Sequence, residues 1–300
     1  MGKEQRAKSQ GQKALCSMPI LAYHKVDSRR ELGITSLSPR RFERQIRFLK
    51  HEGYTSISPP EILDSGFAIS DLRKSEIKSQ KSKTLKPTLI TFDDGYEGVY
   101  IHAYPILKKY ASTAIIFVTT RYIGKYNNWD ASPGPRFKHL DWPRIREMAD
   151  GGIWFGSHGI SHTFLTRQSD SAARYEIEAS KKQLEDGLGR PIRFFSYPYS
   201  NYDDRIINFV QEAGYEAAFS LRPELLKFDV SPRVTRGSTF QDMYALPRIA
   251  IYLTDNMWAF RAKIGGTRGN LLPYMQKAQN RLINRCAYAS MLAEWLRSRG

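Results

Sequence analysis

Residues 87–95 read Pro-Thr-Leu-Ile-Thr-Phe-Asp-Asp-Gly, an apolar run that ends in two carboxylates and a glycine. The run is rich in β-branched and aromatic residues, which predicts a buried strand. Because successive side chains leave a strand in opposite directions, Asp93 and Asp94 can serve different purposes at its carboxyl end. Asp-Asp-Gly is also an ordinary turn sequence, so this stretch alone leaves both interpretations open.

Similar short apolar runs lie on both sides of it. They cover residues 19–24, 54–58, 114–119, 153–157, 193–197, 216–220 and 246–251. Stretches with helical spacing lie between them, at residues 39–52, 99–110, 142–151, 171–188 and 203–214. This alternation is typical of βα units around a parallel sheet. Seven or eight unevenly spaced repeats predict an irregular βα barrel of the α/β class.

The repeats predict one main domain at residues 18–264, which suits a chain of 300 residues. Residues 1–17 are expected to form a basic, flexible arm. The lysine- and serine-rich stretch at about residues 70–86 is expected to be an exposed insertion. Residues 265–300 begin with a glycine-rich hinge loop and continue as a predicted helical tail.

The formal net charge is +16, which favours an anionic partner such as a membrane surface touched by the basic tails. No nucleic-acid-binding motif accompanies this charge, so specific nucleic-acid binding is not expected. The first 13 residues lack the apolar core of a secretory signal, and no apolar run is long enough to span a bilayer. Two distant cysteines, Cys16 and Cys286, do not indicate a disulfide framework. We expect a cytoplasmic protein that associates peripherally with membranes.

Two histidines follow the predicted strand at 153–157, in the sequence Ser-His-Gly-Ile-Ser-His at residues 157–162. An i,i+4 pair on one turn of helix points both rings the same way, and metal sites use this spacing. His158 follows its strand directly, so it should lie at the barrel mouth beside the Asp pair. Two imidazoles and a carboxylate predict a hydrolytic metal site.

Together with Phe-Ser-Tyr-Pro-Tyr at residues 195–199, these motifs resemble the polysaccharide deacetylase family, also called the NodB-homology or carbohydrate esterase 4 family. The resemblance runs from residue 19 to about residue 264. Tyr-His-Lys-Val at 23–26 and Leu-Pro-Arg-Ile at 246–249 are similar to the branch that includes poly-β-1,6-N-acetylglucosamine deacetylases. The family resemblance implies a distorted (β/α)7 barrel. It also implies metal-dependent hydrolysis of N-acetyl groups on N-acetylhexosamine, in a polysaccharide, an oligosaccharide or a glycan precursor.

The resemblance also implies a role for each motif residue. Asp93 corresponds to the general base, which takes a proton from the attacking water. The metal ligands correspond to Asp94, His158 and His162. Zn²⁺ is the first expectation, and Co²⁺, Ni²⁺ or Fe²⁺ would tolerate the same ligands.

In the third motif, Pro198 and Tyr199 correspond to substrate-binding positions. The backbone N–H of Tyr199 corresponds to the donor that stabilises the oxyanion.

The chain departs from the family pattern at two places. Ser196 stands where many members have an arginine that orients the base, and we hypothesise that Arg248 supplies this cation. Residues 246–251 lack the histidine that acts as general acid in many members. His24 ends the first predicted strand and is the candidate acid, although it can equally hydrogen-bond the loop that follows. The remaining histidines are interpreted as surface or structural: His51, His102 and His139.

Two other functions fit part of this pattern. A related barrel hydrolase could cleave a non-sugar amide, because the metal chemistry does not depend on what carries the amide. A non-catalytic, basic binding protein could hold an anionic polymer or a membrane surface. The complete set of two aspartates and two histidines argues against the second alternative.

Overall fold

The computed structural model describes residues 18–29, 31, 33–64, 86–127, 136–221 and 240–265. The predicted arm at 1–17 lies outside the described residues. So do almost all of the predicted insertion at 70–86 and of the predicted tail at 265–300.

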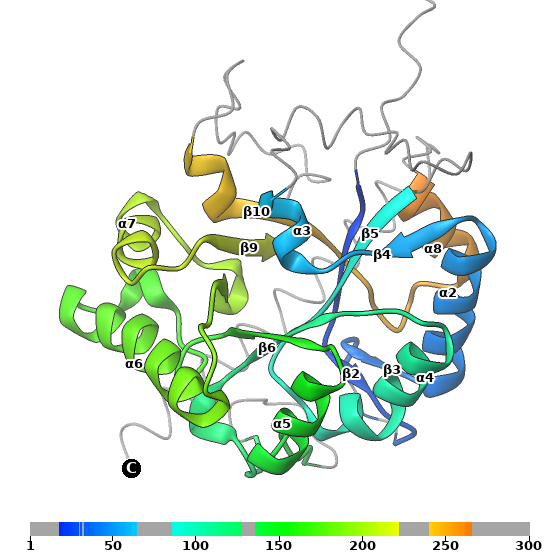
Figure 1. Cartoon of the computed structure of the whole chain (residues 1–300), viewed down its shortest axis with the longest axis horizontal. Helices are drawn as coiled ribbons and strands as arrows, with labels where there is room; N and C mark the ends of the chain where they lie inside the picture. The colour runs from blue at the N-terminus through cyan, green and yellow to red at the C-terminus, as the bar shows by residue number, and fades with distance from the viewer. Residues whose placement is uncertain are drawn as a thin grey trace, which may run out of the picture.

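Within the described residues, seven parallel strands close into a barrel (Figure 1). Neighbouring strands pair in the order β1-β10-β9-β8-β7-β6-β5, and β5 pairs back with β1. The strands are β1 (Ile20–Tyr23), β5 (Lys86–Phe92), β6 (Ile115–Val118), β7 (Trp154–Ser157), β8 (Phe194–Ser196), β9 (Ala217–Leu221) and β10 (Leu246–Ala250). The predicted distorted (β/α)7 barrel is confirmed.

The run predicted at residues 54–58 does form a strand, β4 (Tyr54–Ser56), but it stands outside the closed ring. It pairs only with residues 86–88 at the start of β5. Two further short strands, β2 (Lys25–Val26) and β3 (Ser36–Leu37), pair with each other after β1. Eight predicted runs therefore give seven barrel strands and one additional strand.

Helices surround the barrel on the outside, as Figure 1 shows for α2, α4, α5 and α6. The α-helices are α2 (Pro39–His51), α3 (Pro59–Asp64), α4 (Tyr104–Lys109), α5 (Trp142–Asp150), α6 (Asp170–Leu188), α7 (Asp204–Glu212) and α8 (Met257–Gly265). A π-helical turn, η1 (Val99–Ala103), precedes α4. Four 3-10 turns are η2 (Thr120–Tyr122), η3 (Leu165–Arg167), η4 (Pro198–Ser200) and η5 (Phe240–Ala245). No helix in the described part of the chain is long and apolar enough to cross a bilayer.

Side-chain caps fix where several helices begin. Ser38, Asp141, Ser169 and Asp203 each accept a hydrogen bond from a backbone N–H in the first turn of α2, α5, α6 and α7. Such caps satisfy donors that a helix start leaves without an intrahelical partner. They therefore also fix how long the loops between strands and helices are.

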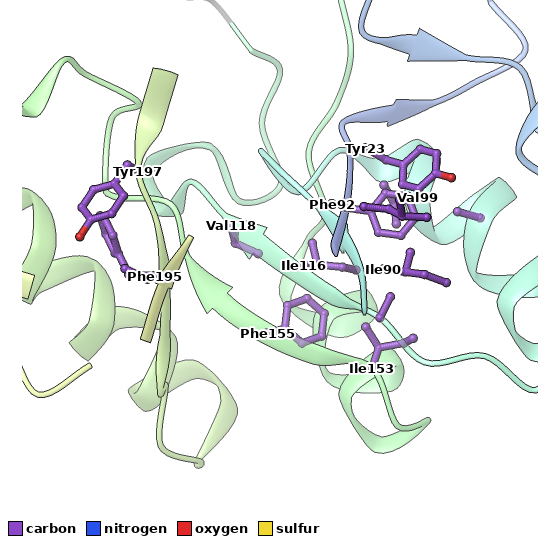
Figure 2. Close-up of a cluster of buried hydrophobic side chains, with 14 of the residues drawn as sticks. Tyr23, Ile90, Phe92, Val99, Ile116, Val118, Ile153, Phe155, Phe195 and Tyr197 are labelled. Atoms are coloured by element: carbon purple, nitrogen blue, oxygen red, sulfur yellow. The ribbon is translucent and has the colours of Figure 1, made fainter. Parts of the chain in front are cut away.

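Two large apolar clusters lie on either side of the barrel wall, and a small third one contains Tyr96, Tyr122 and Phe137. The outer cluster packs between strands and helices, and Figure 2 shows part of it, from Tyr23 on β1 to Tyr197 beyond β8. The inner cluster fills the barrel with Ile20, Leu89, Ile115, Phe117, Phe194, Ala217, Phe219 and Leu246. Strand alternation causes this division: on β5, Ile90 and Phe92 belong to the outer cluster and Leu89 to the inner one.

The same alternation explains why polar groups gather at one end of the barrel. Counting in steps of two from an inner apolar residue reaches positions that also face inward, nearer the carboxyl end. These positions are Thr91 and Asp93 on and after β5, Ser196 on β8 and Arg248 on β10. The barrel interior is thus apolar at one end and charged at the other.

A substitution inside the barrel tests this packing. A Cβ atom on Gly156 of β7 would lie 2.6 Å from the Phe117 ring and 2.8 Å from the carbonyl oxygen of Phe194. We expect Gly156→Ala to lower the free energy of unfolding by about 1–3 kcal/mol, because neither neighbour can move without disturbing the inner cluster. Gly265→Ala is the matched control, since no atom of the described residues lies within 4 Å of its Cβ position. Equal urea midpoints for both variants would contradict the packing described.

Candidate active site

The predicted site residues meet at the carboxyl ends of the barrel strands. Asp93 and Asp94 follow β5, and His158 follows β7. Ser196 is the last residue of β8, and Arg248 lies on β10. Because all seven strands are parallel, their carboxyl ends open on the same mouth, where βα barrels carry their chemistry.

Asp94, His158 and His162 form a buried cluster whose candidate ligand atoms all lie within 4.8 Å of one another. Asp94 Oδ1 is 3.5 Å from His158 Nε2 and 3.2 Å from His162 Nε2. His158 Nδ1 lies 2.7 Å from the backbone oxygen of Ser196. A hydrogen bond there leaves the Nε2 lone pair of His158 directed at the cluster, as metal-binding histidines require.

The histidines converge, but the expected turn of helix does not cause it. Residues 158–164 form an irregular loop. Gly159 and His162 have left-handed backbone conformations, with φ of 75° and 60°. The prediction of a shared helical turn is therefore wrong, because the loop bends twice to bring the second ring back to the first.

This loop is held in place by Glu176, a buried carboxylate on α6. Its Oε2 atom accepts hydrogen bonds from the backbone N–H groups of Ile160 (2.8 Å) and Ser161 (2.9 Å), and Oε1 accepts one from Ser161 Oγ. No sequence motif pointed to Glu176. The helical periodicity could have revealed it, because Glu176 falls on the buried face of α6 beside Ala173 and Ile177. An unpaired charge would be costly at such a position, so a buried partner is expected.

Asp94 also has a left-handed backbone, with φ of 71°. Conformations of this kind cost on the order of 1–3 kcal/mol and need support from their surroundings. His139 gives that support, with Nδ1 lying 2.9 Å from the backbone oxygen of Asp94. Its ring is fully buried and packs 4.6 Å from that of Tyr96, between centroids. His139 is therefore structural, as one of the two interpretations held, and it supports the site directly.

The cluster fits a divalent metal. Asp94 Oδ1 is buried and has no hydrogen-bond partner within the described structure, so an acceptor faces the two imidazoles without a donor. Burial alone would raise the pKa of Asp94, but His162 and the neighbouring histidines outweigh it and hold that pKa well below its usual range. Burial lowers the pKa of His158 to about 4, which keeps its imidazole neutral at pH 7. One carboxylate and two imidazole nitrogens form a ligand set that zinc and other first-row metals accept.

Arg248 and Asp93 form a second buried pair beside this cluster. Nη1 and Nη2 of Arg248 donate to Oδ1 (2.7 Å) and Oδ2 (2.8 Å) of Asp93, and the arginine is 1% exposed. Arg248 also donates to Thr91 Oγ1 and Ser196 Oγ. Burial alone would raise the pKa of Asp93, but the Arg248 charge outweighs it and the pKa is lowered. Arg248 thus makes the contact with Asp93 that we hypothesised from the sequence. The Ser196 hydroxyl accepts a hydrogen bond from Arg248 and donates one to Asp93.

The third sequence motif, residues 195–199, lies against the cluster of Asp94, His158 and His162. Pro198 is buried at the start of the turn η4, and Tyr199 has a left-handed backbone with φ of 55°. The Tyr199 ring stacks on Phe164 with centroids 4.0 Å apart and meets the His162 ring edge-on at 4.4 Å. The structure therefore brings Tyr199 to the site, next to a candidate ligand.

His24 follows β1 and is half-buried. His24 is one of the neighbours that lower the pKa values of Asp93 and Asp94. Its Nδ1 atom is buried without a hydrogen-bond partner within the described residues. Both interpretations of His24, as the acid and as a hydrogen-bonding partner of the loop after the first strand, remain predictions.

Comparisons with known proteins identify the family and support the fold. A family model described as polysaccharide deacetylase matches residues 80–218. YxkH of Bacillus subtilis (strain 168), whose name assigns it to the polysaccharide deacetylases, is 30% identical over 234 residues, covering 78% of this chain and 71% of that protein. The poly-beta-1,6-N-acetyl-D-glucosamine N-deacetylase of Staphylococcus aureus (strain MRSA252) is 27% identical over 237 residues, covering 75% and 70%. The solved structure of IcaB from Ammonifex degensii, 23% identical, superposes with a TM-score of 0.62 over 84% of this chain and 97% of that one, which supports the fold.

The role of Glu176 can be tested without measuring catalysis. We expect Glu176→Gln to weaken Zn²⁺ binding about 10- to 100-fold, because an amide cannot accept all three hydrogen bonds that hold the ligand loop. Titration calorimetry of the metal-stripped protein measures this. Glu178→Gln is the matched control, since Glu178 lies on the same helix and is 54% exposed. Equal Zn²⁺ affinities for the two variants would remove Glu176 from the metal centre's support.

Proposed function

The chain belongs to the polysaccharide deacetylase family, and we propose that it is a metal-dependent hydrolase that removes N-acetyl groups from N-acetylhexosamine residues of a glycan. The observation that carries the proposal is the pairing of two buried sites. A cluster suited to a metal lies directly beside a carboxylate that an arginine holds ionised. Amide hydrolysis needs both, an electrophilic centre for the carbonyl and a base for the water.

We assign Asp94, His158 and His162 as the metal ligands and Zn²⁺ as the metal, with Co²⁺, Ni²⁺ and Fe²⁺ as substitutes that the same ligands tolerate. A divalent cation held there supplies a Lewis acid that polarises an amide carbonyl and makes a water molecule more acidic. Ser196 supports this arrangement through its backbone oxygen, which fixes the ring of His158.

Asp93 accepts the proton of the attacking water. Arg248 binds both of its oxygens, but each carboxylate oxygen keeps a second lone pair that can receive a proton. The arginine fixes the direction of these lone pairs and keeps the carboxylate ionised at neutral pH. Because the pKa of Asp93 is lowered, its carboxylate is a weaker base than a free aspartate.

The remaining roles concern charge that develops during the reaction. The backbone N–H of Tyr199 donates to the oxyanion, and its left-handed conformation sets the direction of that N–H. Pro198 limits the backbone beside it and forms part of the substrate contact. His24 protonates the leaving amine through Nδ1, the buried atom that no described residue engages.

The base assignment is tested with Asp93→Asn. We expect acetate release from N-acetylglucosamine oligomers to fall by about 100-fold or more, while Zn²⁺ content stays unchanged. The double variant Asp93→Asn/Arg248→Met controls for folding, because it also removes the buried cation that the single variant leaves without a counter-charge. Zn²⁺ bound without acetate release from any sugar by the unaltered protein would indicate a non-sugar amide as substrate. Absence of Zn²⁺ binding would overturn the proposal.

Arg248 is tested by Arg248→Lys, which keeps the charge but loses the two-pronged geometry. We expect kcat for acetate release to fall by about 10-fold or more with little change in KM, because the base is misdirected while substrate contacts remain. Arg190→Lys, at a surface pair with Asp150, is the control and should leave kcat unchanged. A normal kcat for Arg248→Lys would show that orientation of Asp93 does not depend on the guanidinium.

A further inference from the structure

A groove outside the proposed metal centre has no role in the chemistry above. It lies between the turn η2 and the helices α5 and α6 and has a volume of about 440 Å³. That volume is in the range of sites that bind small ligands. Its lining includes Thr120, Arg121, Lys125, Trp142 and Arg146.

The groove carries positive charge that nearby carboxylates do not balance. Arg121, Lys125 and Arg146 are exposed, and none pairs with a carboxylate in the part of the chain that the structure describes. The acid in the groove wall, Asp186, already pairs with Lys182 at 2.9 Å. Three unbalanced cations around one hollow attract an anionic ligand.

Two further features point to a bound molecule rather than to bare charge. Thr120 is only 7% exposed, and its Oγ1 atom has no hydrogen-bond partner among the described residues. Buried hydroxyls are normally satisfied, so this atom is a ready donor for a ligand. Trp142 packs against Gly187 so closely that a Cβ there would lie 2.1 Å from the indole, which fixes the ring in the groove wall. Fixed aromatic rings suit the apolar faces of sugars.

The groove wall is joined to the loop that carries the histidines. The backbone N–H of Thr120 donates to the oxygen of Gly159 (3.1 Å), and that of Arg121 donates to the oxygen of Ile160 (3.0 Å). Both acceptors follow directly after His158. The groove wall and the loop of the candidate metal ligands are therefore direct neighbours.

We propose that this groove binds an acidic sugar unit of the substrate, with its anionic group on Arg121, Lys125 and Arg146, and its ring against Trp142. The inference rests on the proposed function and narrows it, because it names an acidic rather than a neutral N-acetylated glycan. The anionic group is a carboxylate or a phosphate, since guanidinium and ammonium groups bind both.

The test is direct binding, measured by calorimetry on the whole protein. The probes are a hyaluronan hexasaccharide, which carries carboxylates, an N-acetylglucosamine hexamer bearing a 6-phosphate, and the unmodified hexamer. We expect at least one acidic probe to bind about 10-fold or more tightly than the neutral hexamer, and higher salt to reduce that difference. The probe that shows this preference identifies the anionic group.

Variants locate the effect. We expect Arg121→Gln/Lys125→Gln to abolish the preference for the acidic probe and to leave binding of the neutral hexamer unchanged. Arg44→Gln/Arg47→Gln removes the same charge from exposed positions on α2 and should keep the preference. Thr120→Val should weaken acidic binding about 10-fold without lowering stability, because the hydroxyl it removes has no partner among the described residues.

Equal affinities for acidic and neutral probes, or equal losses in the α2 control, would overturn the inference. Acetate release is measured separately, so the two proposals fail in different ways. A protein that prefers the acidic probe through the groove but releases no acetate contradicts the proposed function alone. One that deacetylates neutral oligomers without any acidic preference contradicts the groove alone.

Discussion

The buried ion pair between Arg248 and Asp93 is the interaction on which the site depends. A guanidinium that is 1% exposed needs a counter-charge, and removing one partner of such a buried pair typically costs about 3–5 kcal/mol. The pair crosses the barrel interior from β10 to the end of β5, and Ser196 adds a contact from β8. Three strands therefore share one polar network, which fixes Asp93 wherever the barrel is closed.

The next residue, Asp94, faces a different set of side chains. Asp94 leaves the strand end in a left-handed conformation, toward the two histidines and away from the arginine. Two neighbouring carboxylates thus enter different electrostatic environments, Asp93 against a permanent cation and Asp94 against the rings of His158 and His162. His139 and Glu176 offset the backbone strain on either side, each through hydrogen bonds to main-chain atoms. The chemistry of the site follows from this separation.

Much of this was predictable, because local sequence determines it. The inward positions of a strand follow a period of two, so an apolar run with a polar end reveals both the barrel and its mouth. The parts that sequence did not predict depend on contacts between distant segments. Glu176 lies on a different element from the loop it holds, and the loop itself is not the helical turn expected from the spacing of His158 and His162. The strand at 54–58 is real, but only the closure of β1 on β5 excludes it from the ring.

The formal net charge of +16 likewise does not show which basic side chains lack an acidic partner. On the described surface many cations are balanced locally, as Lys181 is by Glu185 and Arg193 is by Glu216. Such pairs contribute little to stability, but they cancel the field that a partner would sense. The cations of the groove lack that cancellation, and they lie beside the loop of the candidate ligands. Since the metal chemistry is indifferent to what carries the amide, selection among glycans has to come from walls of this kind, outside the reacting centre.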